Sequence, residues 1–367
     1  MRKLLVVDSS RPLDVLAAVQ DALAGGPAVL PHPGSPDGVP DTVERRVALA
    51  IETSGSTGRP KRVALGADAV LASAAAADVQ LGGPGQWLLA VPAHYIAGVN
   101  VLVRSIAAQT EPALLPPGSF TAERFVEAAA QLGAPRRYTS LVPAQLTRLI
   151  ESDAALDVLR RFDRILVGGQ AVPITLAARA LELGLNVTRT YGSSETSGGC
   201  VWDGLPIGDT EVRSVDGRVQ IAGSVLAFGY LGDPERTAEA FLDEGGRRWY
   251  RTDDTGTIVD GALAISGRVD DVIVSGGIKV SLAEIEQVVQ TLDGLADAVV
   301  VAAPHPAWGE TPVVVGTTDV ALDVIRAAVS SRLGAAAAPT RMIVVDVIPL
   351  TPNGKPDRPG LVALALK

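Results

Sequence analysis

The chain has 367 residues, of which 47% are hydrophobic and 20% charged, and its formal net charge is −9. This composition is that of an ordinary folded protein, and the length allows two or three domains. The acidic balance argues against a nucleic-acid partner, because proteins that bind a phosphate backbone usually show a basic excess.

The cysteine and histidine content argues against two kinds of structural site. Cys200 is the single cysteine, so no disulfide can form within the chain. The three histidines, His32, His94 and His305, lie far apart and lack the spacing of metal ligands. No window holds about 18 consecutive apolar residues, and the apolar stretch near the N-terminus is too short for a signal peptide. We therefore expect a reducing, cytoplasmic setting without a membrane span.

Strand and helix patterns alternate along the first part of the chain. The spacing of apolar residues predicts a helix over 11–24, with Ser10 as its cap, and another helix over 121–132. Apolar runs predict strands at 47–51, 87–91, 138–142, 164–167 and 187–190. Such alternation is typical of a mostly parallel sheet that is covered by helices on both faces.

The pattern changes twice further along the chain. The pairs Asp216-Gly217 and Asp260-Gly261, each between short apolar strands, predict antiparallel hairpins and a β-rich part over about 209–266. From Arg268 onward, helices over 281–291 and 321–333 alternate with strands near 298–302, 312–316 and 342–347. The sequence thus predicts an α/β fold with a large N-terminal domain over 1–267 and a small α+β C-terminal domain over 268–367.

A segment rich in glycine and hydroxyl side chains follows the first of these strands. Its glycines allow close backbone approach to a ligand, and its hydroxyls, backbone N–H groups and lysine suit phosphate oxygens. A flexible surface loop is the alternative, and the segment lacks the Gly-Lys-Ser/Thr ending of a P-loop. We favour phosphate binding by the residues Thr53, Ser54, Gly55, Ser56, Thr57, Gly58, Arg59, Pro60 and Lys61.

Two further segments place acidic residues at strand ends. Tyr191-Gly192-Ser193-Ser194-Glu195 follows the strand at 187–190, where ligand sites of open α/β sheets gather. Glu195 is a hard oxygen ligand suited to Mg²⁺, and Asp254, in 251–256, could accept both hydroxyls of a ribose. Polar turns with solvated carboxylates are the alternative for both segments.

The last two segments lie at the domain junction and near the C-terminus. Residues 267–280 form two strands around Gly276-Gly277, and Ser281 can cap the helix that follows. Their place between two unlike parts of the chain suggests a hinge. The Pro/Asn/Gly-rich stretch at 349–358 displays Lys355, which could bring a cation to a developing negative charge. An exposed loop is the alternative for this stretch.

Taken together and in this order, the five segments resemble those of the adenylate-forming enzymes, which include acyl- and aryl-CoA ligases. The resemblance runs from about Ala50 to Arg358. It implies an ATP-dependent ligase that makes an acyl-AMP intermediate and binds ATP, Mg²⁺ and coenzyme A. The segment 53–61 becomes the phosphate loop, Ser194 meets the α-phosphate, and Glu195 binds Mg²⁺.

Other roles follow from the same resemblance. Gly168 and Gly169 line the adenine and acyl pocket, and Tyr191 stacks on adenine. Gly192 is a further cofactor-binding residue. Asp254 holds the ribose with Arg268 nearby. Asp270 matches the hinge of a mobile C-terminal lid, and Lys355 matches the catalytic lysine of adenylation. Gly276 and Gly277 face the pantetheine arm of coenzyme A after the lid rotates.

Within this family, residues 91–98, 139–146 and 195–201 are similar to the o-succinylbenzoate–CoA ligases of menaquinone biosynthesis. The resemblance predicts an aromatic carboxylate substrate near His94, Gly198 and Gly199. His94 is also a candidate catalytic residue, although a hydrogen-bonded core histidine is an equal alternative. Arg104 is a weaker candidate for the substrate cation, and a solvated helix face is favoured for it.

Two other functions stay open from the sequence. One is an adenylating enzyme for another acid, or one that loads a carrier protein. The other is a nucleotide-binding relative without catalysis. About 50 residues precede the phosphate loop, fewer than most relatives carry. The sequence also leaves open whether the chain forms a homodimer.

Overall fold

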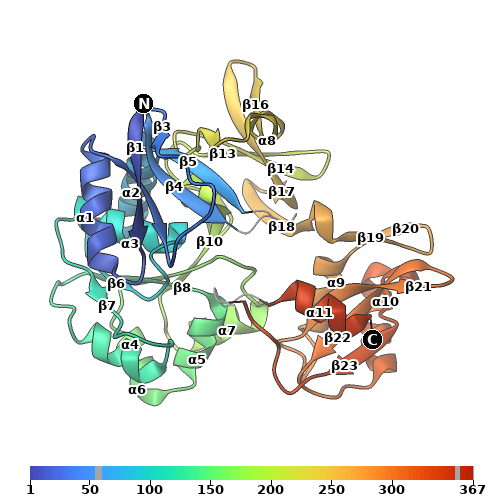
Figure 1. The fold of residues 1–367 in the computed structure, drawn as a ribbon. Helices are drawn as coiled ribbons and strands as arrows, with labels where there is room; N and C mark the ends of the chain where they lie inside the picture. Colours follow the sequence, from blue (N-terminus) through green and yellow to red (C-terminus); the bar gives the residue numbers. More distant parts are fainter. Residues whose placement is uncertain (54–59, 352–355, 367) are drawn as a thin grey trace.

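The computed structural model describes residues 1–53, 60–351 and 356–366. Two sheets form the first half of the chain (Figure 1). The first is parallel at its centre and antiparallel at both edges, whereas the second is antiparallel at one edge only and parallel elsewhere. The first has the order β15-β5-β4-β2-β1-β3 and comprises β1 (Arg2–Asp8), β2 (Ala28–His32), β3 (Thr42–Val43), β4 (Val47–Thr53), β5 (Lys61–Gly66) and β15 (Gly229–Tyr230). The second has the order β12-β11-β10-β9-β8-β6-β7 and comprises β6 (Gln86–Leu89), β7 (Ala113–Leu114), β8 (Arg137–Leu141), β9 (Arg164–Val167), β10 (Val187–Ser193), β11 (Gly198–Trp202) and β12 (Leu205–Pro206).

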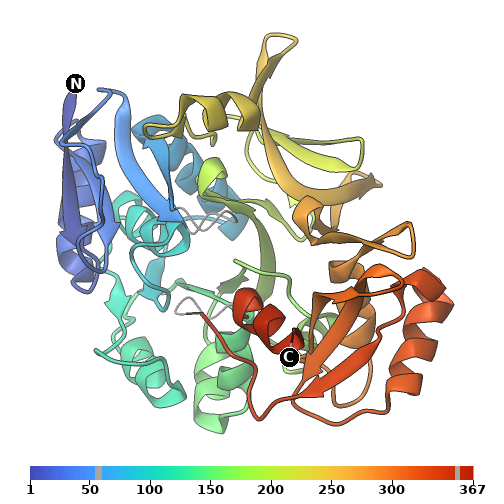
Figure 2. The same cartoon turned by 45° about the vertical axis from the view of Figure 1, so that its right-hand side comes forward.

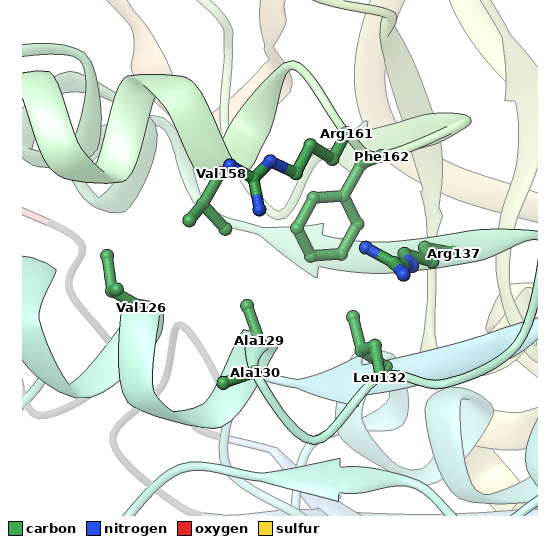
Figure 3. A pocket seen from close by; sticks show the side chains of 8 residues that line it. All are labelled: Val126, Ala129, Ala130, Leu132, Arg137, Val158, Arg161 and Phe162. Carbon is green, nitrogen blue, oxygen red and sulfur yellow. The ribbon is translucent and has the colours of Figure 1, made fainter.

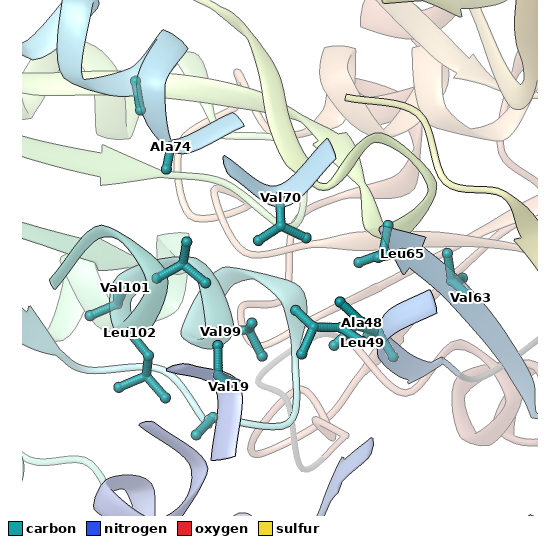
Figure 4. Close-up of a cluster of buried hydrophobic side chains, with 14 of the residues drawn as sticks. Val19, Ala48, Leu49, Val63, Leu65, Val70, Ala74, Val99, Val101 and Leu102 are labelled. Carbon is teal, nitrogen blue, oxygen red and sulfur yellow. The ribbon is translucent and has the colours of Figure 1, made fainter. Parts of the chain in front are cut away.

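Seven helices of the described chain cover these two sheets. Helices α1 (Pro12–Leu23), α2 (Ala67–Leu81) and α3 (Ile96–Ala107) share one apolar core with strands of both sheets. Figure 4 shows part of this core, where Val19 of α1, Val70 of α2 and Val99 of α3 gather near Leu49 and Leu65. The other face of the second sheet carries a second core and the helices α4 (Ala122–Ala129), α5 (Pro143–Ile150), α6 (Asp153–Leu159) and α7 (Ile174–Glu182).

The β-rich part is a third, antiparallel sheet. It comprises β13 (Glu211–Val215), β14 (Arg218–Ala222), β16 (Phe241–Glu244), β17 (Arg247–Val259) and β18 (Ala262–Arg268), with α8 (Pro234–Ala240) beside it. Both predicted hairpin turns are confirmed. Asp216 and Gly217 have φ angles of 52° and 79°, and Asp260 and Gly261 have 51° and 79°. A turn with two positive φ angles matches the twist of the strands it joins.

The C-terminal part is built around a fourth sheet (Figure 2). Its strands are β19 (Val272–Ser275), β20 (Ile278–Ser281), β21 (Val299–His305), β22 (Gly309–Gly316) and β23 (Arg341–Val344). One core lies under α9 (Leu282–Val289) and α10 (Leu322–Leu333), and another lies under α11 (Arg358–Ala365). Ser281 caps α9 as predicted, because its side chain accepts a hydrogen bond from the Glu284 backbone N–H.

The predicted α/β class is confirmed, and two details of the prediction were wrong. The parallel strands belong to two sheets rather than one, because β4 pairs with β2 while β6 pairs with β8. Ser10 does not cap α1. Its hydroxyl donates to Asp8 over 2.8 Å, and the cap position is Arg11, without a side-chain hydrogen bond. Within the described residues, no helix is both long and apolar enough to cross a membrane.

Candidate active site

A buried ion pair joins the two sheets of the N-terminal part. Lys61 opens β5, and Glu195 lies in a short 3-10 turn, Ser194–Thr196, directly after β10. The Lys61 Nζ lies 2.5 Å from Glu195 Oε1, and the Glu195 side chain is only 2% exposed. Burial alone would raise the pKa of Glu195, but Lys61 and the surrounding hydrogen bonds outweigh it, so this pKa is lowered. Glu195 is therefore a buried, charged carboxylate.

A tyrosine completes this cluster. The Tyr230 hydroxyl donates to Glu195 Oε1 over 2.9 Å. Burial and the Glu195 charge raise the pKa of Tyr230, so the phenol keeps its proton and acts as the donor. The Lys61 Nζ lies 5.1 Å from the centre of the Tyr230 ring, and Arg236 Cζ lies 5.3 Å from it. Both cations are within the range of cation–π attraction.

One hydroxyl near the pair has no partner among the described residues. The Oγ1 of Thr53, the strand neighbour of Lys61, is buried without a hydrogen bond. Such a group is costly in a folded protein unless a ligand satisfies it. A phosphate with its hydrated metal ion would supply acceptors and donors here. Among the residues that the structure describes, no group of three or more histidine, cysteine, aspartate or glutamate side chains could hold a metal ion.

Ser197 forms a rigid corner after Glu195. Its φ of 53° is unusual for a residue other than glycine. Its carbonyl oxygen accepts hydrogen bonds from Asn100 of α3 over 2.8 Å and from Ser73 of α2 over 3.1 Å. Its hydroxyl donates to the Val225 carbonyl over 2.8 Å. Three segments thus hold the backbone between Glu195 and Gly198.

The predicted acyl-pocket glycines pack tightly at this corner. Gly198 has a φ of 100°, and a Cβ there would lie 2.2 Å from the Asn100 Nδ2. A Cβ at Gly199 would lie 2.9 Å from the Thr190 Cβ. The predicted adenine turn lies against the same strand, since a Cβ at Gly168 would lie 2.3 Å from the Thr190 Oγ1. Side chains at these positions would displace β10 or α3.

A chain of polar contacts links the predicted ribose site to the predicted hinge. The Tyr191 hydroxyl donates to Asp254 Oδ2 over 2.7 Å. Arg268 Nη1 lies 3.5 Å from Asp254 Oδ1, and its Nε lies 2.8 Å from Asp270 Oδ1. Burial raises the pKa of Asp254, while Tyr191 and Arg268 act against this rise. The structure therefore brings together four residues that were predicted from three separate segments.

His94 lies at the carboxyl ends of the parallel strands of the first sheet. Its Nδ1 is 3.1 Å from the Oγ of Ser9, which follows β1. Burial and the nearby His32 lower the pKa of His94, so the neutral ring is favoured. His32 in turn lies 3.3 Å from Glu52, one residue before Thr53. The ring is hydrogen-bonded and half-buried, and its role toward the substrate stays a prediction.

Arg104 does not lie on a solvated helix face, so that prediction was wrong. Its side chain is buried in the last turn of α3, at the other end of the helix from His94. The guanidinium lies 4.9 Å from the centre of the Trp87 ring. Burial lowers the pKa of Arg104 to about 10, while Asp78 of α2 acts against the shift. These contacts make Arg104 part of the helix packing rather than of the site.

Some predicted site residues cannot be compared with the structure. Ser54, Gly55, Ser56, Thr57 and Gly58 lie outside the described residues, as does Lys355. The Gly276-Gly277 hairpin is described, with φ angles of 58° and 83°. It lies against Trp308, because the Gly276 N–H donates to the Trp308 carbonyl over 2.9 Å.

A separate cavity of about 290 Å³ lies between α4 and α6 (Figure 3). Its walls are mainly apolar, and two arginines contribute to them. None of the predicted site residues lines it, so we do not assign it to the active site. The lining residues are Val126, Ala129, Ala130, Leu132, Arg137, Val158, Arg161 and Phe162.

Sequence reasoning missed four polar residues of this site. They are Ser9, Ser73, Asn100 and Tyr230. The first follows a strand, the next two lie on helices, and Tyr230 lies on a two-residue strand. None stands in a distinctive motif, so only the three-dimensional contacts reveal them.

Comparison with known proteins gives a consistent result. Residues 4–225 match the AMP-binding enzyme family, and residues 284–355 match the AMP-binding enzyme C-terminal domain. A Mycobacterium tuberculosis protein named probable 2-succinylbenzoate–CoA ligase is 38% identical over 99% of this chain and 98% of its own length.

Two solved structures are similar in fold. The amide bond synthetase McbA of Marinactinospora thermotolerans has a TM-score of 0.78 and 26% identity, covering all of this chain and 80% of its own. O-succinylbenzoate coenzyme A synthetase of Bacillus subtilis, in complex with AMP, has a TM-score of 0.73 and 24% identity, over 86% of this chain and 69% of its own. Because the family match spans more than half of its residues, this chain belongs to the AMP-binding enzymes.

Proposed function

We propose that this chain is an ATP-dependent o-succinylbenzoate–CoA ligase that acts through an acyl-AMP intermediate. The observation that carries the proposal is the buried Lys61–Glu195 pair beside the Thr53 hydroxyl, which has no partner among the described residues. This arrangement suits a nucleotide phosphate and a Mg²⁺ ion. The name of the Mycobacterium tuberculosis relative supports the choice of acid and thiol.

The chemistry requires two displacements. A carboxylate is a poor electrophile, because its leaving group would be oxide. In the first step a carboxylate oxygen attacks the α-phosphorus of ATP, the bond to the β-phosphate oxygen breaks, and pyrophosphate leaves. In the second step the thiolate of coenzyme A attacks the acyl carbon, and AMP leaves with the electrons of the C–O bond. Both steps depend mainly on alignment and charge stabilisation.

The residues around Glu195 suit the first step. Glu195 would hold Mg²⁺, which when bound neutralises the phosphate charge. Lys61 and the rest of segment 53–61 would bind the phosphate oxygens, and Ser194 would donate to the α-phosphate. Tyr191 would stack on adenine while Asp254 accepts the ribose hydroxyls. Lys355 would bring a further cation to the reacting groups.

The second step calls for a movement of the C-terminal part, with Asp270 as the hinge. Arg268 contacts both Asp270 and Asp254, so a hinge at Asp270 would lie beside the proposed ribose site. Movement there would take Lys355 out of the site and bring the Gly276-Gly277 hairpin in. The lack of side chains on these glycines suits a thin pantetheine arm. We place the enzyme in the cytoplasm on the basis of its single cysteine.

The aromatic acid would lie between α3 and β11. The backbone of Gly198 and Gly199 would form part of its wall, and His94 lies just before α3. In its neutral form His94 can donate one hydrogen bond to a carboxylate. Arg104 has no part in this pocket because it is buried at the far end of α3.

The test is a substrate panel. Purified protein is incubated with ATP, Mg²⁺ and coenzyme A, together with o-succinylbenzoate, benzoate, a medium-chain fatty acid or no acid. AMP release and thioester mass are followed, and we expect the thioester with o-succinylbenzoate. AMP release with another acid alone would exclude this substrate while keeping the adenylation chemistry. No turnover despite ATP binding would indicate a non-catalytic nucleotide-binding protein.

A variant separates the two steps. Lys355→Ala should abolish adenylation but largely spare thioester formation from supplied acyl adenylate. Equal loss of both half-reactions would contradict the proposed exchange of Lys355 for the hairpin.

A further inference from the structure

Tyr230 is held in place from several sides. It lies on β15, which pairs with β5 so that Tyr230 is opposite Val63, two residues from Lys61. Its backbone N–H donates to the Thr237 hydroxyl of α8 over 2.9 Å. Its ring meets Phe241 edge-on, with centroids 6.1 Å apart. The phenol hydroxyl therefore reaches Glu195 from a fixed direction.

Two donors share one oxygen of the Glu195 carboxylate. The Lys61 ammonium and the Tyr230 hydroxyl both contact Oε1. Lys61 is a flexible side chain whose ammonium can turn toward the phosphates of ATP. When it does so, the Tyr230 hydroxyl still contacts the same oxygen. Of these two donors, only the fixed Tyr230 can keep the Glu195 carboxylate in one orientation while Lys61 moves.

We propose that Tyr230 is a positioning residue for the metal-binding carboxylate of Glu195. Its hydroxyl holds Oε1, so that the carboxylate presents a constant geometry to the metal while Lys61 engages the phosphates. Partners of this kind commonly contribute about 10- to 100-fold to metal affinity. The inference rests on the proposed function, because it requires that Glu195 bind a divalent metal together with ATP.

The test measures metal binding rather than turnover. Mn²⁺ replaces Mg²⁺ as the probe, α,β-methylene-ATP is present, and electron paramagnetic resonance counts the free Mn²⁺. Tyr230→Phe keeps the ring and its packing but removes the hydroxyl, and it should weaken Mn²⁺ binding about 10- to 100-fold. The matched control is Tyr138→Phe, which removes a phenol hydroxyl that donates to Leu81 and Gly83 over 3.2 and 3.1 Å. It should bind Mn²⁺ as the parent protein does.

Two further variants separate positioning from a general structural role. Tyr230→4-aminophenylalanine returns a donor to the same place and should restore Mn²⁺ affinity. In a Glu195→Gln background, Tyr230→Phe should cause no additional loss, since its effect acts through the carboxylate.

Each remaining outcome counts against the inference. Unchanged Mn²⁺ affinity in Tyr230→Phe would overturn it, as would an equal loss in Tyr138→Phe. An additional loss in the Glu195→Gln background would show that Tyr230 acts elsewhere. If the parent protein bound no Mn²⁺ with the nucleotide, the proposed function would fail as well, whereas the first three outcomes leave that function intact.

Discussion

Replacing Lys61 by methionine should destabilise the folded protein markedly. The Lys61 side chain is 17% exposed and that of Glu195 only 2%, with 2.5 Å between Nζ and Oε1. Lys61→Met keeps most of the aliphatic packing but leaves the Glu195 charge buried, with Tyr230 as a remaining donor. Breaking a buried ion pair on one side typically costs about 3–5 kcal/mol. For a domain of this size the melting temperature should fall by roughly 10 °C.

Urea unfolding followed by circular dichroism measures this loss. The double variant Lys61→Met/Glu195→Gln should recover part of it, because the uncompensated charge is then gone. Lys279→Met is the control, since Lys279 is exposed on β20, and it should change little. A loss below about 1 kcal/mol for Lys61→Met would refute the reasoning, because that magnitude belongs to solvent-exposed pairs.

Three further predictions concern other parts of the site. His94 has a folded-state pKa below its unfolded value of about 6.5, so its contribution to stability is present above that pH and is lost as pH falls through the folded pKa. When the free energy of unfolding is measured in urea, its fall from pH 8 to pH 5 should therefore be smaller for His94→Gln than for the parent protein. Equal falls in the two proteins would contradict this. Gly198→Ala combines a positive φ with a clash against Asn100 and should cost about 1–3 kcal/mol of stability; an unchanged urea midpoint would refute it. Asp254→Asn should raise the KM for ATP about 10- to 100-fold in an AMP-release assay, because a charged hydrogen-bond acceptor is lost; an unchanged KM would exclude Asp254 from nucleotide binding.

The local features of the fold could be predicted because they depend on a few neighbouring residues. Asp-Gly and Gly-Gly pairs are among the residues that tolerate two positive φ angles, so all three hairpins were predicted. The Ser281 cap followed from its place directly before an amphipathic helix. Ser10 occupies a similar place, but the prediction that it caps α1 was wrong, because its hydroxyl donates a hydrogen bond to Asp8 instead.

Features that depend on distant parts of the chain could not be predicted in this way. The division of the parallel strands between two sheets is decided by pairings between segments, such as β4 with β2, that no local pattern encodes. The burial of Arg104 depends on Asp78 and Trp87, which lie on other elements. In the same way, Tyr230 lies in the site because β15 pairs with β5, and no local pattern predicts that pairing.

The Ser197 corner has a consequence for engineering. A mutant library meant to change the accepted acid would naturally sample α3 and β11, which flank the proposed pocket. Asn100 lies within that region, yet its amide and the Ser73 hydroxyl support the Ser197 carbonyl, two residues after Glu195. A substitution at Asn100 would thus be read as altered acid selectivity while the primary defect lay in the backbone beside Glu195. Such a library should hold Asn100 constant and vary the residues around it.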